Sequence, residues 1–301
     1  MKLLPTMKQL QYLVALADHM HFGAAAEACF VTQSTLSSGI KDLEDILTAP
    51  VAERTNRSVM LTPLGERIVE QARQLLNDAE AMVDMAAQKT GPLSGLLRLG
   101  VIPTIGPYLL PKVVPELHRA YPHLELYLRE DYSDRLLEWL SNGKLDLLLL
   151  ALPFPMEGVK TEELFDDGFV LACPLDHPLA GRPSVGMDEF AEEPLLLLEE
   201  GHCLRQHSLA ACSLEGRAKS KGFEATSMPT LIQMVVGGMG ITLLPEMAAE
   251  AGIAKGLEIS LVPLKKGAGT RQIGLVWRKT SSRGDDFRLL GDFIKGCMRK
   301  A

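Results

Sequence analysis

The chain lacks the features that mark several classes of protein. Only 5% of its 301 residues are aromatic, which is few for a protein that binds single-stranded nucleic acid by base stacking. The longest strongly apolar run, residues 147–154, is far shorter than the roughly 20 residues that span a bilayer. The first residues lack the apolar core of a signal peptide. These absences predict a cytoplasmic protein that does not bind membranes.

The chain also lacks a dense cysteine framework and an excess of positive charge. Five cysteines spread over the chain do not form the disulfide framework of a small secreted protein. The net charge is −7, and residues 1–90 hold 8 basic against 11 acidic residues, so overall charge does not indicate nucleic-acid binding. A prediction of DNA binding must therefore rest on local pattern. The common nucleotide-binding, serine-hydrolase and zinc-protease motifs are missing, and no metal or cofactor is predicted.

The amino-terminal residues have the periodicity of helices. Apolar spacing predicts three short helices between residues 7 and 47, and only Phe30 and Val31 separate the second from the third. Thr32 is a suitable N-cap for the third helix, which carries small polar residues on its outer face. A short helix, a tight turn and a helix of this kind are typical of a helix-turn-helix. A generic three-helix bundle is the alternative.

A wing and a long helix follow. Arg54 and Arg57 lie at the tip of a predicted two-stranded wing. Thr62 and Pro63 form a typical helix start, and apolar positions then recur as far as Ala86. A stalk helix with so long an apolar stripe is expected to pair with a second copy, so the sequence predicts a dimer.

Beyond residue 96 the pattern changes to short apolar runs that alternate with helices. The order is strand, helix, strand, helix, strand, which predicts a parallel sheet covered on both faces. Further strands are predicted near residues 169–173, 195–198, 240–244 and 272–277. About two hundred residues of this pattern suit two α/β lobes with a ligand cleft between them.

Motifs in the amino-terminal 90 residues resemble those of the LysR-type transcriptional regulators. The matching segments are Gln9 to Ala17, His21-Phe22, Ala25-Ala26, Val31 to Ser37, Leu43-Glu44, Glu53 to Thr55 and Leu61 to Gly65. Three positions depart from the family pattern: Ala24 replaces an Arg, Gly39 a polar residue, and Thr48 the Gly that usually ends the helix. The resemblance implies a DNA-binding module despite these departures.

The resemblance also implies an α/β architecture in four parts. Residues 1–62 form a winged helix-turn-helix, residues 63–90 a dimerisation helix, and residues 91–95 a hinge. Residues 96–301 form an effector domain similar to periplasmic binding proteins. Its lobe I covers about 96–165 and 269–301, and its lobe II about 166–268. The side chains expected to contact DNA are Gln33, Ser34, Thr35, Ser38 and Lys41 on the recognition helix, and Arg54 and Arg57 on the wing.

The effector half resembles the hydrogen-peroxide sensors of this family. The marks are residues 102–111, 198–205, 240–245 and 273–278. The block from Gly201 to Arg205 contains Cys203, and a second cysteine, Cys212, follows nine positions later. The resemblance implies that peroxide oxidises Cys203 and that Cys212 then forms a disulfide with it. Two departures, Gln206 and His207, fall inside the same block.

The surroundings expected for Cys203 follow from the form of its sulfur that peroxide oxidises, the thiolate. Because peroxide reacts with thiolates, Cys203 is expected at a helix N-terminus, beside His202, with a lowered pKa. The resemblance places Thr104, Ser133 and Arg271 in the same pocket, where they position the peroxide and stabilise negative charge. Residues nine apart on a helix lie about 13 Å apart, whereas a disulfide needs Cα atoms within about 7 Å. The segment must therefore unwind to form the bond.

The resemblance implies a transcriptional activator of antioxidant genes and not an enzyme. The expected partners are double-stranded operator DNA, hydrogen peroxide and RNA polymerase, with glutathione and glutaredoxin, or thioredoxin, as reductant. The expected assembly is a homodimer or homotetramer. One alternative is a regulator of the same family that binds a small metabolite in the cleft. Another is a thiol peroxidase.

Overall fold

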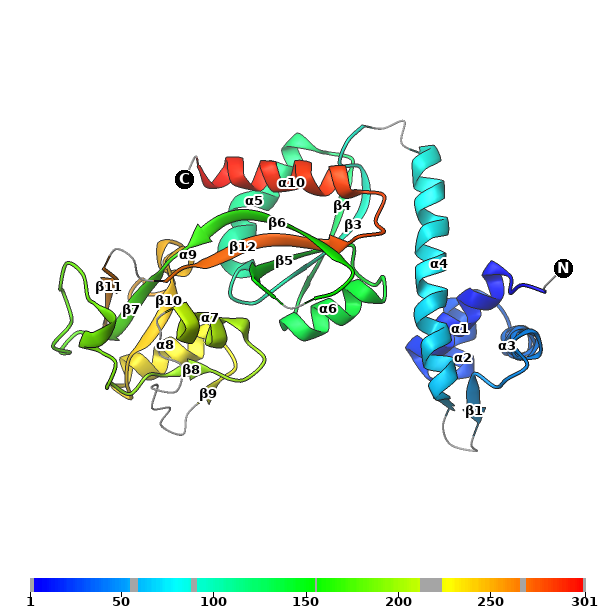
Figure 1. Ribbon diagram of the computed structural model, residues 1–301, viewed down its shortest axis with the longest axis horizontal. Helices are drawn as coiled ribbons and strands as arrows, with labels where there is room; N and C mark the ends of the chain where they lie inside the picture. The colour runs from blue at the N-terminus through cyan, green and yellow to red at the C-terminus, as the bar shows by residue number, and fades with distance from the viewer. Residues whose placement is uncertain are drawn as a thin grey trace. The chain divides into compact units, whose positions relative to one another are not determined.

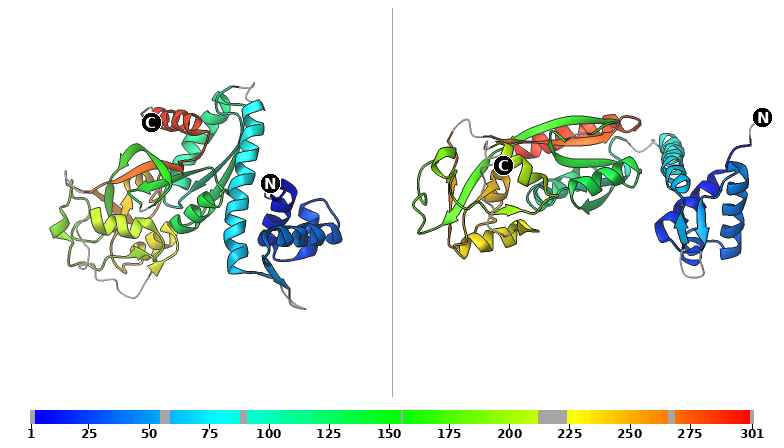
Figure 2. Two further views of the ribbon diagram at one scale, coloured as in Figure 1. Left: turned by 45° about the vertical axis from the view of Figure 1, so that its right-hand side comes forward. Right: turned by 60° about the horizontal axis from the view of Figure 1, so that its bottom comes forward.

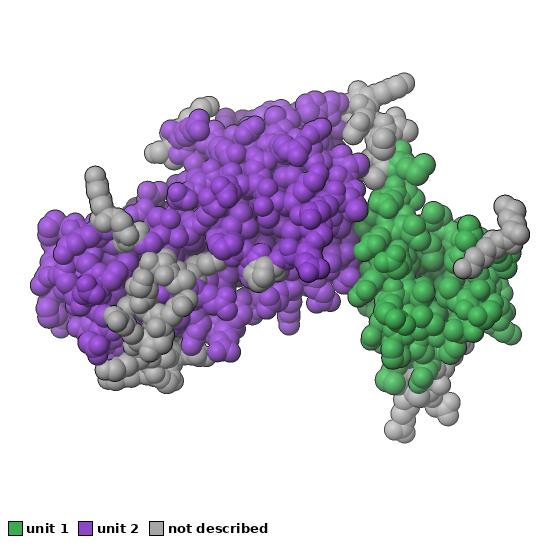
Figure 3. Space-filling view, viewed as in Figure 1, with its two compact units in different colours: residues 1–89 green, residues 90–301 purple. Residues whose placement is uncertain are grey.

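The structure is a computed structural model that describes residues 3–54, 59–87, 91–154, 156–211, 224–265 and 269–299. The chain divides into two compact units, residues 1–89 and residues 90–301, which Figure 3 colours separately. None of the helices within the described ranges is long and apolar enough to span a membrane.

The first unit contains the predicted three helices, α1 (Met7–His19), α2 (Phe22–Ala28) and α3 (Gln33–Leu47). Leu13, Leu16 and Leu36 are fully buried where the helices meet. The side chain of Thr32 accepts a hydrogen bond from the backbone N–H of Thr35 at 3.2 Å, which confirms the predicted N-cap. The local sequence signals thus determined where each helix begins.

The wing and the long helix complete this unit. Strands β1 (Ala52–Arg54) and β2 (Val59–Leu61) pair antiparallel, as predicted, while the tip with Arg57 lies outside the described residues. Helix α4 (Pro63–Ala87) begins at the predicted position, because the Thr62 hydroxyl accepts a hydrogen bond from the N–H of Gly65 at 2.9 Å. The ion pair between Arg73 and Asp18, at 2.7 Å, ties α4 to α1.

The second unit contains a five-stranded sheet in the order β4-β3-β5-β12-β6. Its strands are β3 (Gly95–Val101), β4 (Leu124–Glu130), β5 (Leu147–Leu152), β6 (Val159–Asp167) and β12 (Arg271–Arg278). Strand β3 pairs parallel with β4 and β5, which confirms the predicted parallel arrangement, whereas β12 runs antiparallel to β5 and β6. Helices α5 (Gly106–Ala120) and α10 (Gly284–Met298) cover one face and α6 (Ser133–Ser141) the other (Figures 1 and 2).

A second, smaller sheet has the order β10-β7-β11. The strands are β7 (Phe169–Pro174), β10 (Thr242–Pro245) and β11 (Ile259–Pro263), all antiparallel. Beside them lie the parallel pair β8 (Leu197–Leu198) and β9 (Glu224–Ala225), a short 3-10 turn (Met187–Glu189), and the helices α7 (Cys203–Ala211), α8 (Met228–Val236) and α9 (Glu246–Glu250). The sequence did not predict β6, β9 or β11.

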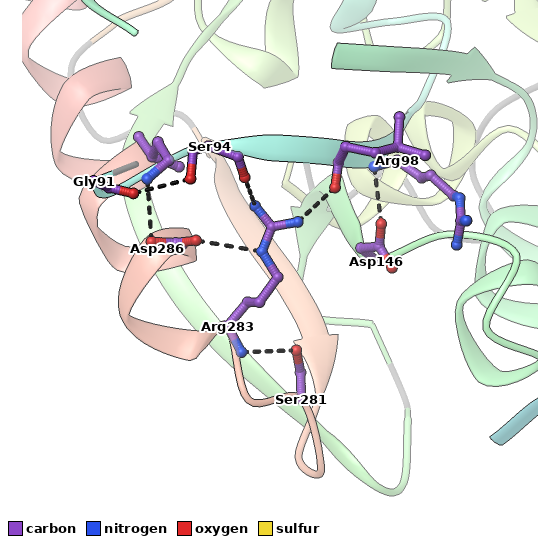
Figure 4. Close-up of polar contacts among 9 residues, drawn as sticks. Gly91, Ser94, Arg98, Asp146, Ser281, Arg283 and Asp286 are labelled. Atoms are coloured by element: carbon purple, nitrogen blue, oxygen red, sulfur yellow. Dashed lines mark hydrogen bonds and ion pairs between the residues drawn. The ribbon is translucent and has the colours of Figure 1, made fainter. Parts of the chain in front are cut away.

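The start of β3 is tied to the start of α10 by the contacts drawn in Figure 4. The guanidinium of Arg283 donates hydrogen bonds to the backbone oxygens of Ser94 and Leu96. The carboxylate of Asp286 accepts one from the N–H of Leu93 at 3.3 Å. These bonds join the first residues of the second unit to its last helix. The start and the end of this unit's chain are therefore linked beside the five-stranded sheet.

Candidate functional site

Helix α3 presents the residues predicted to contact DNA. Its apolar stripe, which includes Leu36 and Ile40, is buried in the first unit. The five predicted side chains on this helix are all exposed: Gln33, Ser34, Thr35, Ser38 and Lys41. The hydroxyl of Thr32 lies 2.9 Å from that of Ser34 and 2.7 Å from that of Thr35, so the helix start is a network of small polar groups. Strand β1 ends at Arg54.

Tertiary packing explains one departure from the family pattern. A Cβ atom at Gly39 would lie 2.6 Å from Cδ2 of Tyr12, closer than side chains tolerate. The buried ring of Tyr12 therefore occupies the space that a larger residue at position 39 would need. Thr48 ends α3 with a left-handed φ of 56°, a conformation that glycine adopts with less strain. Nothing in the structure explains Ala24.

The cysteine predicted to react is the first residue of α7. The turn before it contains Gly201, whose φ of +104° is a left-handed conformation suited to glycine. The Cys203 side chain is only 6% exposed. It borders a cavity of about 610 Å³ that α7 lines together with Asp134, Phe154 and Glu200.

Opposing effects act on the pKa of Cys203. Burial is the largest and raises the pKa above its ordinary value. The side chains of Ser133 and Arg271 and the N–H groups of Cys203 and Leu204 lower it, but by less. The prediction of a lowered pKa is therefore wrong for this state of the protein, because the sequence did not show how deeply the thiol is buried. The groups that stabilise a thiolate are nevertheless in place.

Ser133 lies at the start of α6 and is 2% exposed. Within the described residues, its hydroxyl has no partner at both the distance and the angle of a normal hydrogen bond. Its weaker interaction with the Cys203 thiol is the second largest influence on the pKa of that thiol. The hydroxyl beside the sulfur is thus a buried polar group with unused hydrogen-bonding capacity.

Arg271, which acts on the pKa of Cys203, also contacts Thr104. The guanidinium of Arg271 donates to the hydroxyl of Thr104 at 2.8 Å and to its backbone oxygen at 2.9 Å. It also donates to Asp167 at 2.9 Å, and both charged side chains are almost fully buried. Asp167 in turn accepts a hydrogen bond from the N–H of Met247. Sequence reasoning missed Asp167, which ends the unpredicted strand β6.

His202 is buried and points toward another partner. Its Nε2 atom lies 3.0 Å from the backbone oxygen of Thr226, and burial lowers the pKa of His202, which favours the neutral imidazole. Its ring meets the ring of Tyr132 edge to face, with centroids 4.5 Å apart. The hydroxyl of Tyr132 donates to Glu199 at 2.7 Å. Glu199 lies within the block 198–205 that marks the resemblance, without a predicted role, and Tyr132 was not identified from the sequence.

Cys212 lies outside the described residues, directly after the end of α7 at Ala211. His207 lies on α7, and Gln206 before it is exposed at the cavity. All the residues from Cys203 to Ala211 are helical. Any bond between the two cysteines therefore requires that α7 changes its conformation.

Comparison with known proteins establishes the family. A model of the LysR substrate binding domain matches residues 90–298, and a model of the bacterial regulatory helix-turn-helix proteins of the lysR family matches residues 7–66. The chain belongs to the LysR family of transcription regulators. The helix-turn-helix of this regulator therefore binds DNA, and the thiol-peroxidase alternative is wrong because the family is not one of enzymes.

Individual relatives match over nearly the whole LysR-type chain. The DNA-binding transcriptional dual regulator OxyR of Escherichia coli K12 is 43% identical over 291 residues, which cover 97% of this chain and 95% of that protein. The HTH-type transcriptional regulator EstR of Acinetobacter baylyi is 40% identical over 295 residues, 98% of each. A full-length OxyR of Pseudomonas aeruginosa with a Cys-to-Asp substitution has a TM-score of 0.81 at 36% identity, covering 96% of this chain and 94% of that one.

Proposed function

We propose that this LysR-type regulator senses hydrogen peroxide through Cys203 and Cys212 and controls antioxidant genes. Similarity alone does not carry this proposal, because EstR is nearly as similar as OxyR. The observation that carries it is the environment of Cys203, a buried thiol at a helix start with Ser133 and Arg271 acting on its sulfur. In this proposal residues 1–62 bind DNA, residues 63–90 dimerise, residues 91–95 form the hinge and residues 96–301 sense peroxide.

The proposed reaction has two steps. The Cys203 thiolate attacks one peroxide oxygen, the O–O bond breaks, and the released hydroxide takes up a proton to leave as water. The products are a sulfenic acid and water. The Cys212 thiol then attacks the sulfenic sulfur, so that the S–S bond forms, the S–O bond breaks and a second water leaves. Glutathione with glutaredoxin, or thioredoxin, is the proposed reductant of the disulfide.

The pocket residues have distinct roles in the first step. The Ser133 hydroxyl is a buried donor next to the sulfur and is proposed to hold a peroxide oxygen. The Arg271 guanidinium is proposed to stabilise the negative charge on sulfur and on the departing oxygen. Thr104 positions Arg271, since its hydroxyl and backbone oxygen both accept from the guanidinium. Neutral His202 is proposed to hold the turn before Cys203 through Thr226.

Two cysteine variants test this proposal. Cys203→Ser should stay reduced at micromolar peroxide and keep the resting DNA footprint. Cys212→Ser should accumulate a sulfenic acid that dimedone traps at Cys203, with little change in footprint. Mass spectrometry of the wild-type protein after stoichiometric peroxide should show one bond between Cys203 and Cys212. Trapping at Cys212 in the Cys203→Ser variant, as fast as at Cys203 in the converse variant, would reverse the assignment.

The metabolite-binding alternative is favoured by one observation, the size of the cavity beside Cys203, about 610 Å³. A pocket of this volume accommodates a small organic molecule. The same mass spectrum distinguishes the two functions. If the wild-type protein forms no disulfide and its footprint is unchanged by peroxide, the result supports the metabolite-binding regulator, with the cysteines incidental.

The DNA contacts are proposed in two groups. Gln33 and its polar neighbours on α3 are proposed to read bases in the major groove, and Arg54 and Arg57 to contact backbone or minor groove. Gln33→Ala should therefore weaken discrimination between operators. Arg57→Ala should weaken binding to every sequence and reduce the salt slope by about one unit for each phosphate that the wing no longer neutralises. Unchanged affinity and slope for Arg57→Ala contradict the role of the wing.

Assembly is proposed to involve α4. Leu75, Met82 and Val83 on this helix are between 50% and 71% exposed, which is unusual for large apolar side chains so near one another. A second copy of the chain is proposed to cover them, giving a homodimer or homotetramer that contacts RNA polymerase at the promoter. Sedimentation at micromolar concentration should show a dimer or tetramer, and a persistent monomer would refute this part of the proposal.

A further inference from the structure

Tyr132 contacts three positions of the turn that leads into Cys203. Its hydroxyl donates to Glu199 at 2.7 Å, and its ring lies edge-on to His202 with centroids 4.5 Å apart. Its Cδ2 atom is 3.9 Å from the point where Gly201 would carry a Cβ. The next residue along the chain, Ser133, interacts with the Cys203 thiol. One aromatic side chain thus packs along the turn formed by residues 199–202.

Tyr132 and the turn formed by residues 199–202 belong to different parts of the second unit. Tyr132 precedes α6, which packs on the five-stranded sheet. The turn follows β8, which pairs with β9 outside the five-stranded sheet, and leads into α7. The hydrogen bond joins residues 67 apart in sequence. It also raises the pKa of Tyr132, so the phenol stays protonated and remains a donor at neutral pH. The contact therefore holds the Cys203 end of α7 against the start of α6.

The two proposed redox steps make opposite demands on this contact. Sulfenic acid forms while Cys203 stays beside Ser133 and Arg271, which a fixed turn favours. Disulfide formation needs α7 to unwind and Cys203 to move toward Cys212, which a fixed turn opposes. A side chain that holds the turn therefore slows the second step without participating in the chemistry of the first.

We propose that Tyr132 is a positioning residue that sets the rate at which oxidised Cys203 leaves its pocket to form the disulfide. The proposal rests on the peroxide-sensing function proposed above. The hydrogen bond to Glu199 restrains the turn, and the ring packs against Gly201 and His202. Breaking the hydrogen bond alone lowers the barrier to unwinding, while the retained ring keeps the pocket intact for sulfenic acid formation.

The test separates the two steps with Tyr132→Phe, which removes only the hydroxyl. In a Cys212→Ser background, we measure the second-order rate constant of sulfenic acid formation by dimedone trapping. Adding Tyr132→Phe should change this rate constant by less than about twofold. With both cysteines present, the disulfide rate at saturating peroxide should rise about tenfold, equivalent to about 1.4 kcal/mol for a hydrogen bond to a carboxylate. Tyr127→Phe is the matched control, because Tyr127 is an exposed tyrosine on β4 outside this contact, and it should change neither rate.

A double-mutant cycle shows whether Glu199 is the partner. In a Glu199→Ala background, Tyr132→Phe should change the disulfide rate by less than twofold. Equal disulfide rates for wild type and Tyr132→Phe would overturn the proposal, as would a slower sulfenic acid step with an unchanged disulfide rate. A full tenfold effect in the Glu199→Ala background would overturn it too, because the hydroxyl would then act through another group.

Hydrogen exchange of the reduced protein tests the restraint by Tyr132 independently of the proposed peroxide-sensing function. Amides at residues 207 and 208, which lie beyond the first turn of α7, should exchange about tenfold faster in Tyr132→Phe, while those of α10 should not change. If wild-type protein forms no disulfide but the exchange result holds, the peroxide function fails and the restraint by Tyr132 stands. If wild type forms the disulfide but exchange is the same in both proteins, the restraint fails and the function stands.

Discussion

Breaking the buried pair of Arg271 and Asp167 should strongly destabilise the second unit. Arg271 is 1% exposed and Asp167 is 4% exposed, and their charged atoms approach to 2.8 Å. Arg271→Met removes the positive charge and leaves the Asp167 carboxylate buried, with the N–H of Met247 as its remaining described hydrogen-bond donor. Losing one member of a buried pair costs about 3–5 kcal/mol. This is a large part of the roughly 5–15 kcal/mol that holds a domain folded.

Removing the second charge should restore part of that loss. In Arg271→Met with Asp167→Asn, the amide oxygen can still accept from Met247, and no unpaired charge remains buried. The double variant should therefore be about 2 kcal/mol more stable than Arg271→Met alone. Both tryptophans, Trp139 and Trp277, lie in the second unit, so urea unfolding followed by tryptophan fluorescence reports on this unit specifically.

The oxidation rate of the same variants separates folding from chemistry. Arg271 lowers the pKa of Cys203, so its loss should slow sulfenic acid formation even in the stabilised double variant. A free energy of unfolding within about 1 kcal/mol of wild type for Arg271→Met would refute the stability argument, since one partner of a pair buried this deeply cannot be removed at so little cost. Restored stability with restored oxidation would show that Arg271 acts only by holding the fold.

Two further predictions concern individual residues. Burial raises the pKa of Cys203 above its ordinary value, so the thiolate fraction should rise about tenfold per pH unit between roughly pH 6 and 8. The rate of sulfenic acid formation, measured by dimedone trapping, should rise in parallel. A flat profile would mean that the thiolate is already formed at about pH 6. Gly39→Ala should lower the melting temperature followed by circular dichroism. Overpacking against Tyr12 costs about 1–3 kcal/mol, which exceeds the gain of up to about 1 kcal/mol in helix propensity. The matched change Gly296→Ala, with open space around it, should be neutral or stabilising.

The sequence by itself determined the order of elements in the helix-turn-helix and the parallel strands of the larger sheet. The signals were local: Thr32 and Thr62 cap helices through their own side chains, and the apolar run of β5 is buried along its whole length. Such features depend on the backbone within a few residues, so periodicity and capping chemistry are sufficient to find them. Strand β6 was missed because it is rich in acidic residues and lies at the sheet edge.

Only the tertiary structure decided the chemistry of the pocket. Asp167 meets Arg271 across 104 residues, and Tyr132 meets Glu199 across 67. Burial of Cys203, which reversed the predicted direction of its pKa, depends on how α7 packs against distant segments. Desolvation and hydrogen bonding are set by all the atoms around a group, and a pattern along the chain carries no information about atoms that folding brings from elsewhere.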